Sequence, residues 1–258
     1  MFAIVGEATI YYEIEGPFDA PALVLSNSLG TDISMWRWQL DALTGPFRVV
    51  RYDSPGHGRS QTTEAPYTVE LLARDVIGLA DHLELERFSI CGVSLGGGVG
   101  IWLAAHAPAC VEKLVVANTA SHFDSPESWN ARIEAIRNEG MASIADAVVE
   151  RWFTPTFRER CPAEVEGARR MLLAVPAEGY IACCEAVRDG DLRADLASMR
   201  TPTLVIGGTD DPAVPPDKCR AMADAIDGAR FIELPSAHLS NIEAAEAFNS
   251  AVLKFLTT

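Results

Sequence analysis

A serine flanked by glycines is the residue of this chain with the clearest chemical potential. Ser94 lies in Gly92-Val93-Ser94-Leu95-Gly96, a G-x-S-x-G pattern. The apolar run 88–91 predicts a strand before it, and the apolar spacing in 95–106 predicts a helix after it. A sharp strand-to-helix turn holds its serine outward in a strained conformation, and glycines at 92, 96, 97 and 98 leave room for that turn. Ser94 is therefore predicted to be a nucleophile at a helix N-terminus, where N–H groups favour developing negative charge.

An acid that could support this serine follows the predicted buried strand 203–207. Asp211 fits best, because it lies three residues after Gly208 and four before Pro215. Asp210 stays open as an alternative, although a role in a turn or as an N-cap suits it better. The other place for such an acid, after the predicted strand 113–117, holds Asn118 and Thr119, which carry no carboxylate.

One histidine has both the position and the context of a general base. His238 follows the predicted strand 231–234 directly, on a loop that can reach the serine and the acid together. The other four lie in a loop that shapes the site, on predicted helices or at the start of the middle segment: His57, His82, His106 and His122. The chain order Ser94, Asp211, His238 is that of the α/β-hydrolase fold. These three residues are predicted to form a catalytic triad.

Backbone donors for an oxyanion are expected after an early strand. The predicted strand 22–25 is followed by the loop 26–31, which contains Asn27 and Ser28. The N–H groups of Leu29 and Leu95 are the best candidates, because each follows the small or nucleophilic residue that positions it.

Strand-like and helix-like segments alternate over residues 20–118 and again from 201 onward, after a predicted hairpin formed by 2–5 and 9–13. This alternation predicts an α/β fold with a mostly parallel central sheet flanked by helices. Residues 121–196 break the rhythm with helical patterns, and Ser125-Pro126 predicts an N-cap and first helical position there. We expect residues 1–120 and 197–258 to form an α/β-hydrolase core and 121–196 an inserted helical cap.

Composition narrows the range of partners. A formal net charge of −15 argues against nucleic acid or an anionic membrane as partner. The sequence contains no apolar run of transmembrane length and no secretory signal, so its six cysteines are expected to be reduced thiols in the cytoplasm. Zinc, phosphate-loop and dinucleotide fingerprints are missing from the sequence, so neither a metal nor an organic cofactor is expected. The patterns do not indicate an oligomeric state.

Several segments together resemble 3-oxoadipate enol-lactonases, bacterial α/β-hydrolases of the β-ketoadipate pathway of aromatic degradation. The resemblance covers nearly the full length and is carried by residues 27–31, 52–60, 92–97, 208–212 and 237–243. It implies hydrolysis of a five-membered enol-lactone bearing a carboxymethyl group to 3-oxoadipate. The implied route is an acyl-enzyme on Ser94, without metal or cofactor.

A carboxylate-bearing substrate needs a local cation on this acidic protein. Arg132 is the first candidate, because its helical neighbours at i±3 and i±4 include Trp129 and no acid. Such an arginine must bind an anion, form a tertiary salt bridge or extend to water, and the three possibilities stay open. Arg151 and Trp152 form a second candidate pair in the cap.

Rival functions share the same residues. The chain could be another small-ester, lactone or carbon–carbon bond serine hydrolase of this fold, or a cofactor-free perhydrolase. A non-catalytic ligand receptor on the same scaffold is a further alternative, which an intact Ser94, Asp211 and His238 set disfavours.

Overall fold

An eight-stranded sheet runs through the computed structural model, which describes residues 1–123 and 125–258. Its strand order is β1-β2-β4-β3-β5-β6-β7-β8. Only the contacts of β2 with β1 and β4 are antiparallel, and the other neighbours are parallel. The strands are β1 (Phe2–Val5), β2 (Ala8–Glu15), β3 (Ala22–Ser26), β4 (Arg48–Tyr52), β5 (Phe88–Val93), β6 (Val111–Ala117), β7 (Thr203–Gly208) and β8 (Arg230–Leu234). The predicted mostly parallel sheet and its leading hairpin are confirmed.

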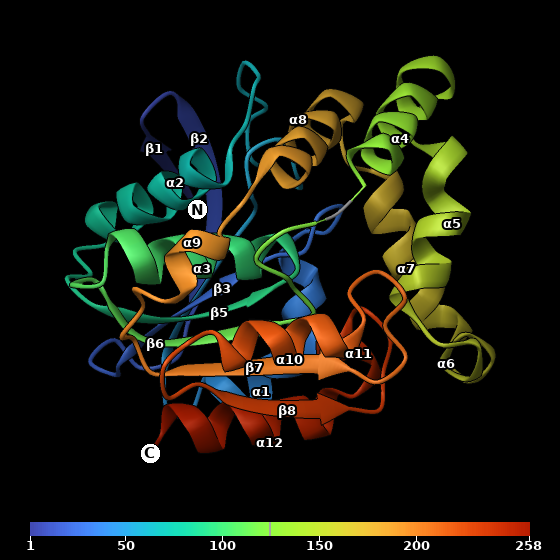
Figure 1. Cartoon of the computed structure of the whole chain (residues 1–258). Coiled ribbons are helices and arrows are strands. Elements are labelled where there is room, and N and C mark those ends of the chain that lie inside the picture. The colour runs from blue at the N-terminus through green and yellow to red at the C-terminus, as the bar shows by residue number, and fades with distance from the viewer. Residues whose placement is uncertain (124) are drawn as a thin grey trace.

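The central strands β5 and β7 are buried because helices cover both faces of the sheet. Every residue of β5 and β7 is buried. Helices α2 (Val69–His82), α3 (Leu95–His106) and α9 (Arg193–Leu196) lie on one face, and α1 (Arg37–Leu43) and α12 (Ala245–Leu256) on the other (Figure 1). Helix α10 (Pro216–Asp224) packs against β7 and β8.

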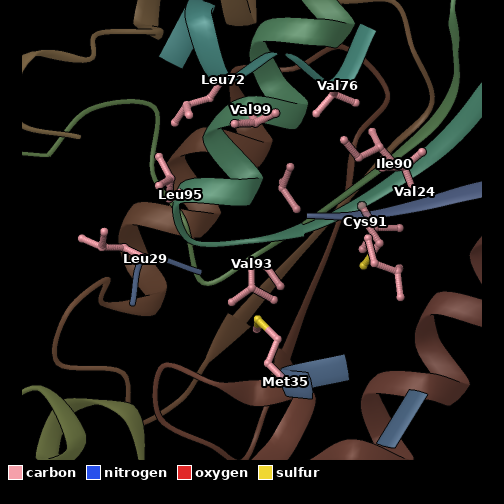
Figure 2. Close-up of a cluster of buried hydrophobic side chains, with 14 of the residues drawn as sticks. Val24, Leu29, Met35, Leu72, Val76, Ile90, Cys91, Val93, Leu95 and Val99 are labelled. Atoms are coloured by element: carbon pink, nitrogen blue, oxygen red, sulfur yellow. The ribbon is translucent and has the colours of Figure 1, made fainter. Parts of the chain in front are cut away.

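The core beneath the predicted nucleophile joins helices and sheet. Figure 2 shows Leu72 and Val76 of α2 beside Val99 of α3, with Ile90 and Val93 of β5 below. Helix α3 is buried around most of its circumference, including Gly96, Gly97 and Ile101. The apolar spacing predicted that one face of this helix is buried. The structure buries more of it, because α2, α9 and the sheet enclose α3.

The described residues between β6 and α9 form five helices: α4 (Pro126–Glu139), α5 (Ala142–Trp152), α6 (Pro155–Arg160), α7 (Pro162–Leu173) and α8 (Ala177–Asp189). They stand on the side of the sheet to which the arrowheads of β7 and β8 point (Figure 1). In the described part of the predicted cap, residues 121–196, the only β pairing is the isolated bridge between His122 and Asp191. We call residues 121–196 the cap segment; its last residues, in α9, pack against α3.

The predicted start of the first cap helix is half correct. Helix α4 begins at Pro126, but the Ser125 side chain makes no capping hydrogen bond. Ser125 adopts a left-handed conformation with φ 71°, and its carbonyl accepts from the Ser128 N–H at 3.0 Å. The fixed φ of proline starts the helix, and the backbone turn replaces the side-chain cap.

Two short elements complete the chain, the 3-10 helix η1 (Ile33–Trp36) and helix α11 (Ser240–Glu243). Helix α11 ends at Glu243, and the C-terminal helix α12 begins separately at Ala245. All six cysteines are free thiols. No helix among the described residues is both long and apolar enough to cross a membrane.

Candidate active site

Ser94 occupies the turn between β5 and α3. Its backbone has φ 55° and ψ −116°, a conformation that residues other than glycine rarely adopt. A Cβ on Gly92 would lie 2.1 Å from the Gly96 carbonyl oxygen, and one on Gly96 would lie 2.2 Å from that of Ser26. Both glycines are therefore required by the turn. Gly98 is not, because the nearest atom to a Cβ there would be 3.9 Å away, which corrects the prediction that it supplies room.

The imidazole of His238 meets the carboxylate of Asp211. His238 Nδ1 lies 2.8 Å from Asp211 Oδ2, and both side chains are buried. Because a carboxylate only accepts, Nδ1 carries the proton, and Nε2 of the neutral ring keeps its lone pair. This tautomer is the one that a general base requires.

Asp211 is held ionised by its neighbours. Burial acts to raise its pKa, but the charge and hydrogen bond of His238 outweigh it, and the pKa of Asp211 falls below its usual range. The other oxygen, Oδ1, accepts from the N–H groups of Ala213 and Val214 at 2.8 and 3.0 Å. Asp210 is exposed, and its carboxylate accepts from the Thr209 hydroxyl at 2.8 Å. Of the two predicted alternatives, only Asp211 therefore contacts the histidine.

The loop that carries Leu29 is fixed to the first turn of α3 through Asn27. The Asn27 carbonyl accepts from Gly96 N–H at 3.0 Å, while its side chain bonds Tyr52 and Trp36, each at 2.8 Å. This arrangement brings the predicted donor Leu29 beside the turn that contains Leu95. Figure 2 shows both side chains at that end of α3.

The loop 53–60 supports the loop 27–33 through two hydrogen bonds. The N–H of Gly30 donates to His57 Nε2 at 3.0 Å, and the N–H of Ile33 donates to Asp53 Oδ1 at 2.8 Å. Burial lowers the pKa of His57 to about 4, so that its ring is neutral and Nε2 accepts. Gly30 has φ +84°, and a Cβ there would lie 2.7 Å from Leu172 of the cap segment. The buried His57 thus supports the loop that carries Leu29.

Ser94 and His238 line a cavity of about 230 Å³ between the sheet and the cap segment. Its described wall carries three cationic side chains, Arg132, Arg151 and Lys218, and no Asp or Glu. The lining also includes the polar Ser28, the aliphatic Leu29 and the aromatic residues Trp129, Trp152 and Tyr180. The cavity therefore combines a potential nucleophile and base with a positive wall, which suits a small anionic substrate.

Comparisons with known proteins agree with this geometry. The model of the alpha/beta hydrolase family matches residues 23–251. The chain belongs to this family. It is 39% identical to 3-oxoadipate enol-lactonase 2 of Acinetobacter baylyi over 95% of this chain and 92% of the relative. It is also 32% identical to a putative carbamate hydrolase of Caulobacter sp., over 96% of each chain.

A solved structure extends the similarity to three dimensions. The enol-lactonase from Burkholderia xenovorans LB400 superimposes with a TM-score of 0.99 and 45% identity, and the match covers all of both chains. The resemblance to 3-oxoadipate enol-lactonases found in the sequence is confirmed. The α/β-hydrolase described here is therefore a hydrolytic enzyme.

Arg132 of the hydrolase lies on the cavity wall. Its guanidinium stacks over the Trp129 ring at 4.6 Å, and the buried Tyr180 lines the same cavity. Burial and the nearby charge of Arg132 lower the pKa of Arg151 below its usual range. Two guanidinium groups that repel each other beside a cavity form a site that an anion would stabilise. Trp152 is buried and forms the adjoining wall.

Asn118 is a site residue that the sequence did not reveal. Its Nδ2 donates to Asp211 Oδ2 and to the Ala237 carbonyl, both at 3.1 Å. Its Oδ1 accepts from the Ser240 hydroxyl at 2.5 Å. Asn118 follows β6, where only a carboxylate was sought, and it ties the acid to the histidine loop instead.

Lys218 was also missed. It lies in the first turns of α10, after the loop that carries Asp211, and it lines the cavity with Ser94. The Pro215-Pro216 pair was the available signal. It predicts that a helix starts there, soon after Asp211, and therefore that Lys218 lies near the acid.

Proposed function

We propose that the enzyme hydrolyses 3-oxoadipate enol-lactone to 3-oxoadipate through an acyl-enzyme on Ser94, as a step of the β-ketoadipate pathway. The observation that carries this proposal is one cavity in which Ser94 and His238 face a wall of cationic side chains. The names of the relatives with 38% and 39% identity support the lactone as substrate.

The first half of the reaction opens the ring. The Ser94 hydroxyl attacks the lactone carbonyl carbon while His238 Nε2 takes its proton. Asp211 holds the ring in the required tautomer and stabilises the imidazolium. The N–H groups of Leu29 and Leu95 bind the oxyanion of the tetrahedral intermediate, which then collapses with cleavage of the ring C–O bond. The leaving oxygen departs as an enolate, takes the proton from His238 and tautomerises to the ketone.

The second half releases the product. A water molecule loses a proton to His238 Nε2 and attacks the ester carbon of the acyl-enzyme. The new tetrahedral intermediate uses the same two backbone donors. Its collapse breaks the bond to Ser94 Oγ, which regains a proton from His238, and 3-oxoadipate leaves with a second carboxylate.

The substrate's carboxymethyl group binds the cationic wall in this proposal. Arg132 is its principal partner, because its guanidinium packs on the Trp129 ring and lines the cavity. Arg151 adds a second positive charge, and Trp129 and Trp152 enclose the apolar faces of the lactone. Among the three possibilities that the sequence left open for Arg132, this proposal selects anion binding.

Activity measurements on a substrate panel test this proposal. The loss of enol-lactone absorbance is followed beside simple lactones, uncharged esters and a carbamate, which represents the more distant relatives. We expect the highest kcat/KM for the carboxylate-bearing enol-lactone. Equal or higher values for uncharged esters would favour a general esterase, and no turnover of any substrate would favour a ligand receptor.

A further inference from the structure

One carboxylate joins the cap segment to the loop of the predicted catalytic histidine. Glu243, the last residue of α11, accepts hydrogen bonds from both sides. Its Oε2 accepts from the Ala237 N–H at 2.9 Å, directly before His238. The same carboxylate accepts from the N–H of Thr154 at 3.2 Å and from the Thr154 hydroxyl.

Thr154 belongs to the junction between α5 and α6, immediately after two residues of the cavity region. Trp152 lines the cavity, and Phe153 is fully buried. A second bond joins the same two segments, because the Leu239 N–H donates to the Trp152 carbonyl at 3.1 Å. The residues on both sides of His238 are thus bonded to the cap junction, Ala237 through Glu243 and Leu239 directly.

Ala237 is held through its carbonyl as well. Its carbonyl accepts from Asn118 Nδ2 at 3.1 Å, and the same amide group donates to Asp211. Glu243 therefore completes a set of bonds that fixes the backbone before His238 relative to both the acid and the cap. Oε2 of Glu243 accepts from both the Ala237 and the Thr154 N–H, and Oε1 accepts from Thr154 as well. A glutamine in its place keeps one acceptor oxygen but loses the second acceptor and the negative charge.

We propose that Glu243 is a positioning residue, which sets the direction of the His238 imidazole by clamping its loop to the Thr154 end of α5. This inference rests on the proposed role of His238 as general base. It implies that a substrate bound against Arg151 and Trp152 contacts the same end of α5 that holds the His238 loop in place. Displacement of a reacting group by about 1 Å can reduce turnover by about 100-fold, so the clamp acts on kcat and not on substrate affinity.

The test compares Glu243→Ala and Glu243→Gln with Glu246→Ala, a control at an exposed glutamate three residues further along. Two probes that need no cationic wall are used: hydrolysis of p-nitrophenyl acetate and the second-order rate of Ser94 labelling by diisopropyl fluorophosphate. Circular dichroism and thermal unfolding establish that each variant is folded at the assay temperature.

We expect Glu243→Ala to lower both the labelling rate and kcat by about 10- to 100-fold, with KM within about twofold of wild type. Glu243→Gln should lose less, since its carbonyl oxygen can still accept from the Ala237 and Thr154 N–H groups, and Glu246→Ala should behave as wild type. A merely stabilising role would lower the unfolding temperature and leave kcat of the folded enzyme unchanged.

Wild-type labelling and kcat in folded Glu243→Ala would overturn the inference, as would an equal loss in Glu246→Ala. If Glu243→Ala does not fold, Thr154→Val against Thr154→Ser makes the same comparison from the cap side, because only the serine variant keeps the hydroxyl donor. Equal kcat in those two variants would then overturn it. Failure of the wild-type enzyme to be labelled would instead overturn the proposed triad, and this inference with it.

Discussion

At the scale of single residues, the site depends on how each polar group is held by its partners. Asp211 is ionised because His238, Asn118 and two backbone N–H groups all donate to it. The neighbouring Asp210 is exposed, and its carboxylate accepts from the Thr209 hydroxyl. Two adjacent carboxylates with different surroundings should therefore have very different effects when replaced.

We expect Asp211→Asn to lower kcat by about 10⁴-fold, because an amide facing Nδ1 favours the wrong histidine tautomer. Asp210→Asn is the matched control, and it should change kcat little. Steady-state kinetics with p-nitrophenyl acetate measure both variants. A larger loss in Asp210→Asn would assign the acid role to that residue instead.

Arg132 provides a prediction about selectivity. Arg132→Met should lower kcat/KM for the anionic lactone by about 10- to 100-fold, since a charge-assisted hydrogen bond contributes roughly 1.5–3 kcal/mol. The uncharged p-nitrophenyl acetate should hardly be affected. Arg137→Met is the control, because Arg137 lies on the same helix but pairs with Glu185 at 3.4 Å. Equal losses for both substrates would make Arg132 structural, and no loss for either would place the anion site elsewhere, with Arg151 as the next residue to change.

At the scale of elements, loops between strands and helices hold the site together. The loop 53–60 supports the loop 27–33 through His57 and Asp53, and the cap junction at Thr154 supports the histidine loop. These contacts join segments that are far apart in the chain. Their titratable members make the stability of the enzyme depend on pH.

His57 should make the enzyme less stable in acid. Its pKa is about 4 in the native state and ordinarily 6.5, so between these values the unfolded chain binds more protons and stability falls as the pH is lowered. From pH 7 to pH 5 this loss amounts to about 2 kcal/mol. Asp53 acts in the opposite direction, because burial raises its pKa to about 6 and the native state gains its proton first.

Urea unfolding of wild type and His57→Gln at several pH values separates the two contributions. The glutamine carbonyl can still accept from Gly30, but it does not titrate. We expect the stability difference, wild type minus variant, to fall by about 2 kcal/mol between pH 7 and pH 5. Replacement of the exposed His82 by glutamine is the control. A pH-independent difference for His57→Gln would contradict a neutral, buried His57.

The sequence predicted elements better than the contacts between them. Parallel strands covered on both faces leave apolar runs, so β3, β5, β6 and β7 were found to within two residues of their ends. The edge strand β8 is only partly buried, and its apolar residues located it equally well. Asp211 and His238, which the structure brings into contact, could be named as candidates because each follows such a strand. Asn118 and Glu243 were missed because their hydrogen bonds join residues that are far apart in the sequence. Asn118 contacts Asp211, and Glu243 contacts Thr154 and Ala237. The Ser125 cap failed because the local backbone turn supplied the hydrogen bond.

At the scale of the whole molecule, charge is distributed unevenly. The chain carries a formal net charge of −15, yet the described wall of its cavity bears three cations and no acid. The acidic surface weakens binding of polyanions, and the local cations attract a small anion. The boundaries of the cap segment and a cytoplasmic location stay predictions.

The central claim is that this α/β-hydrolase opens an enol-lactone with Ser94. The most direct measurement is kcat/KM for 3-oxoadipate enol-lactone with wild type and Ser94→Ala side by side, after circular dichroism has shown that both are folded. The account predicts rapid hydrolysis by wild type and a loss of at least about 10⁴-fold in the variant. Near-normal lactone hydrolysis by folded Ser94→Ala would contradict it.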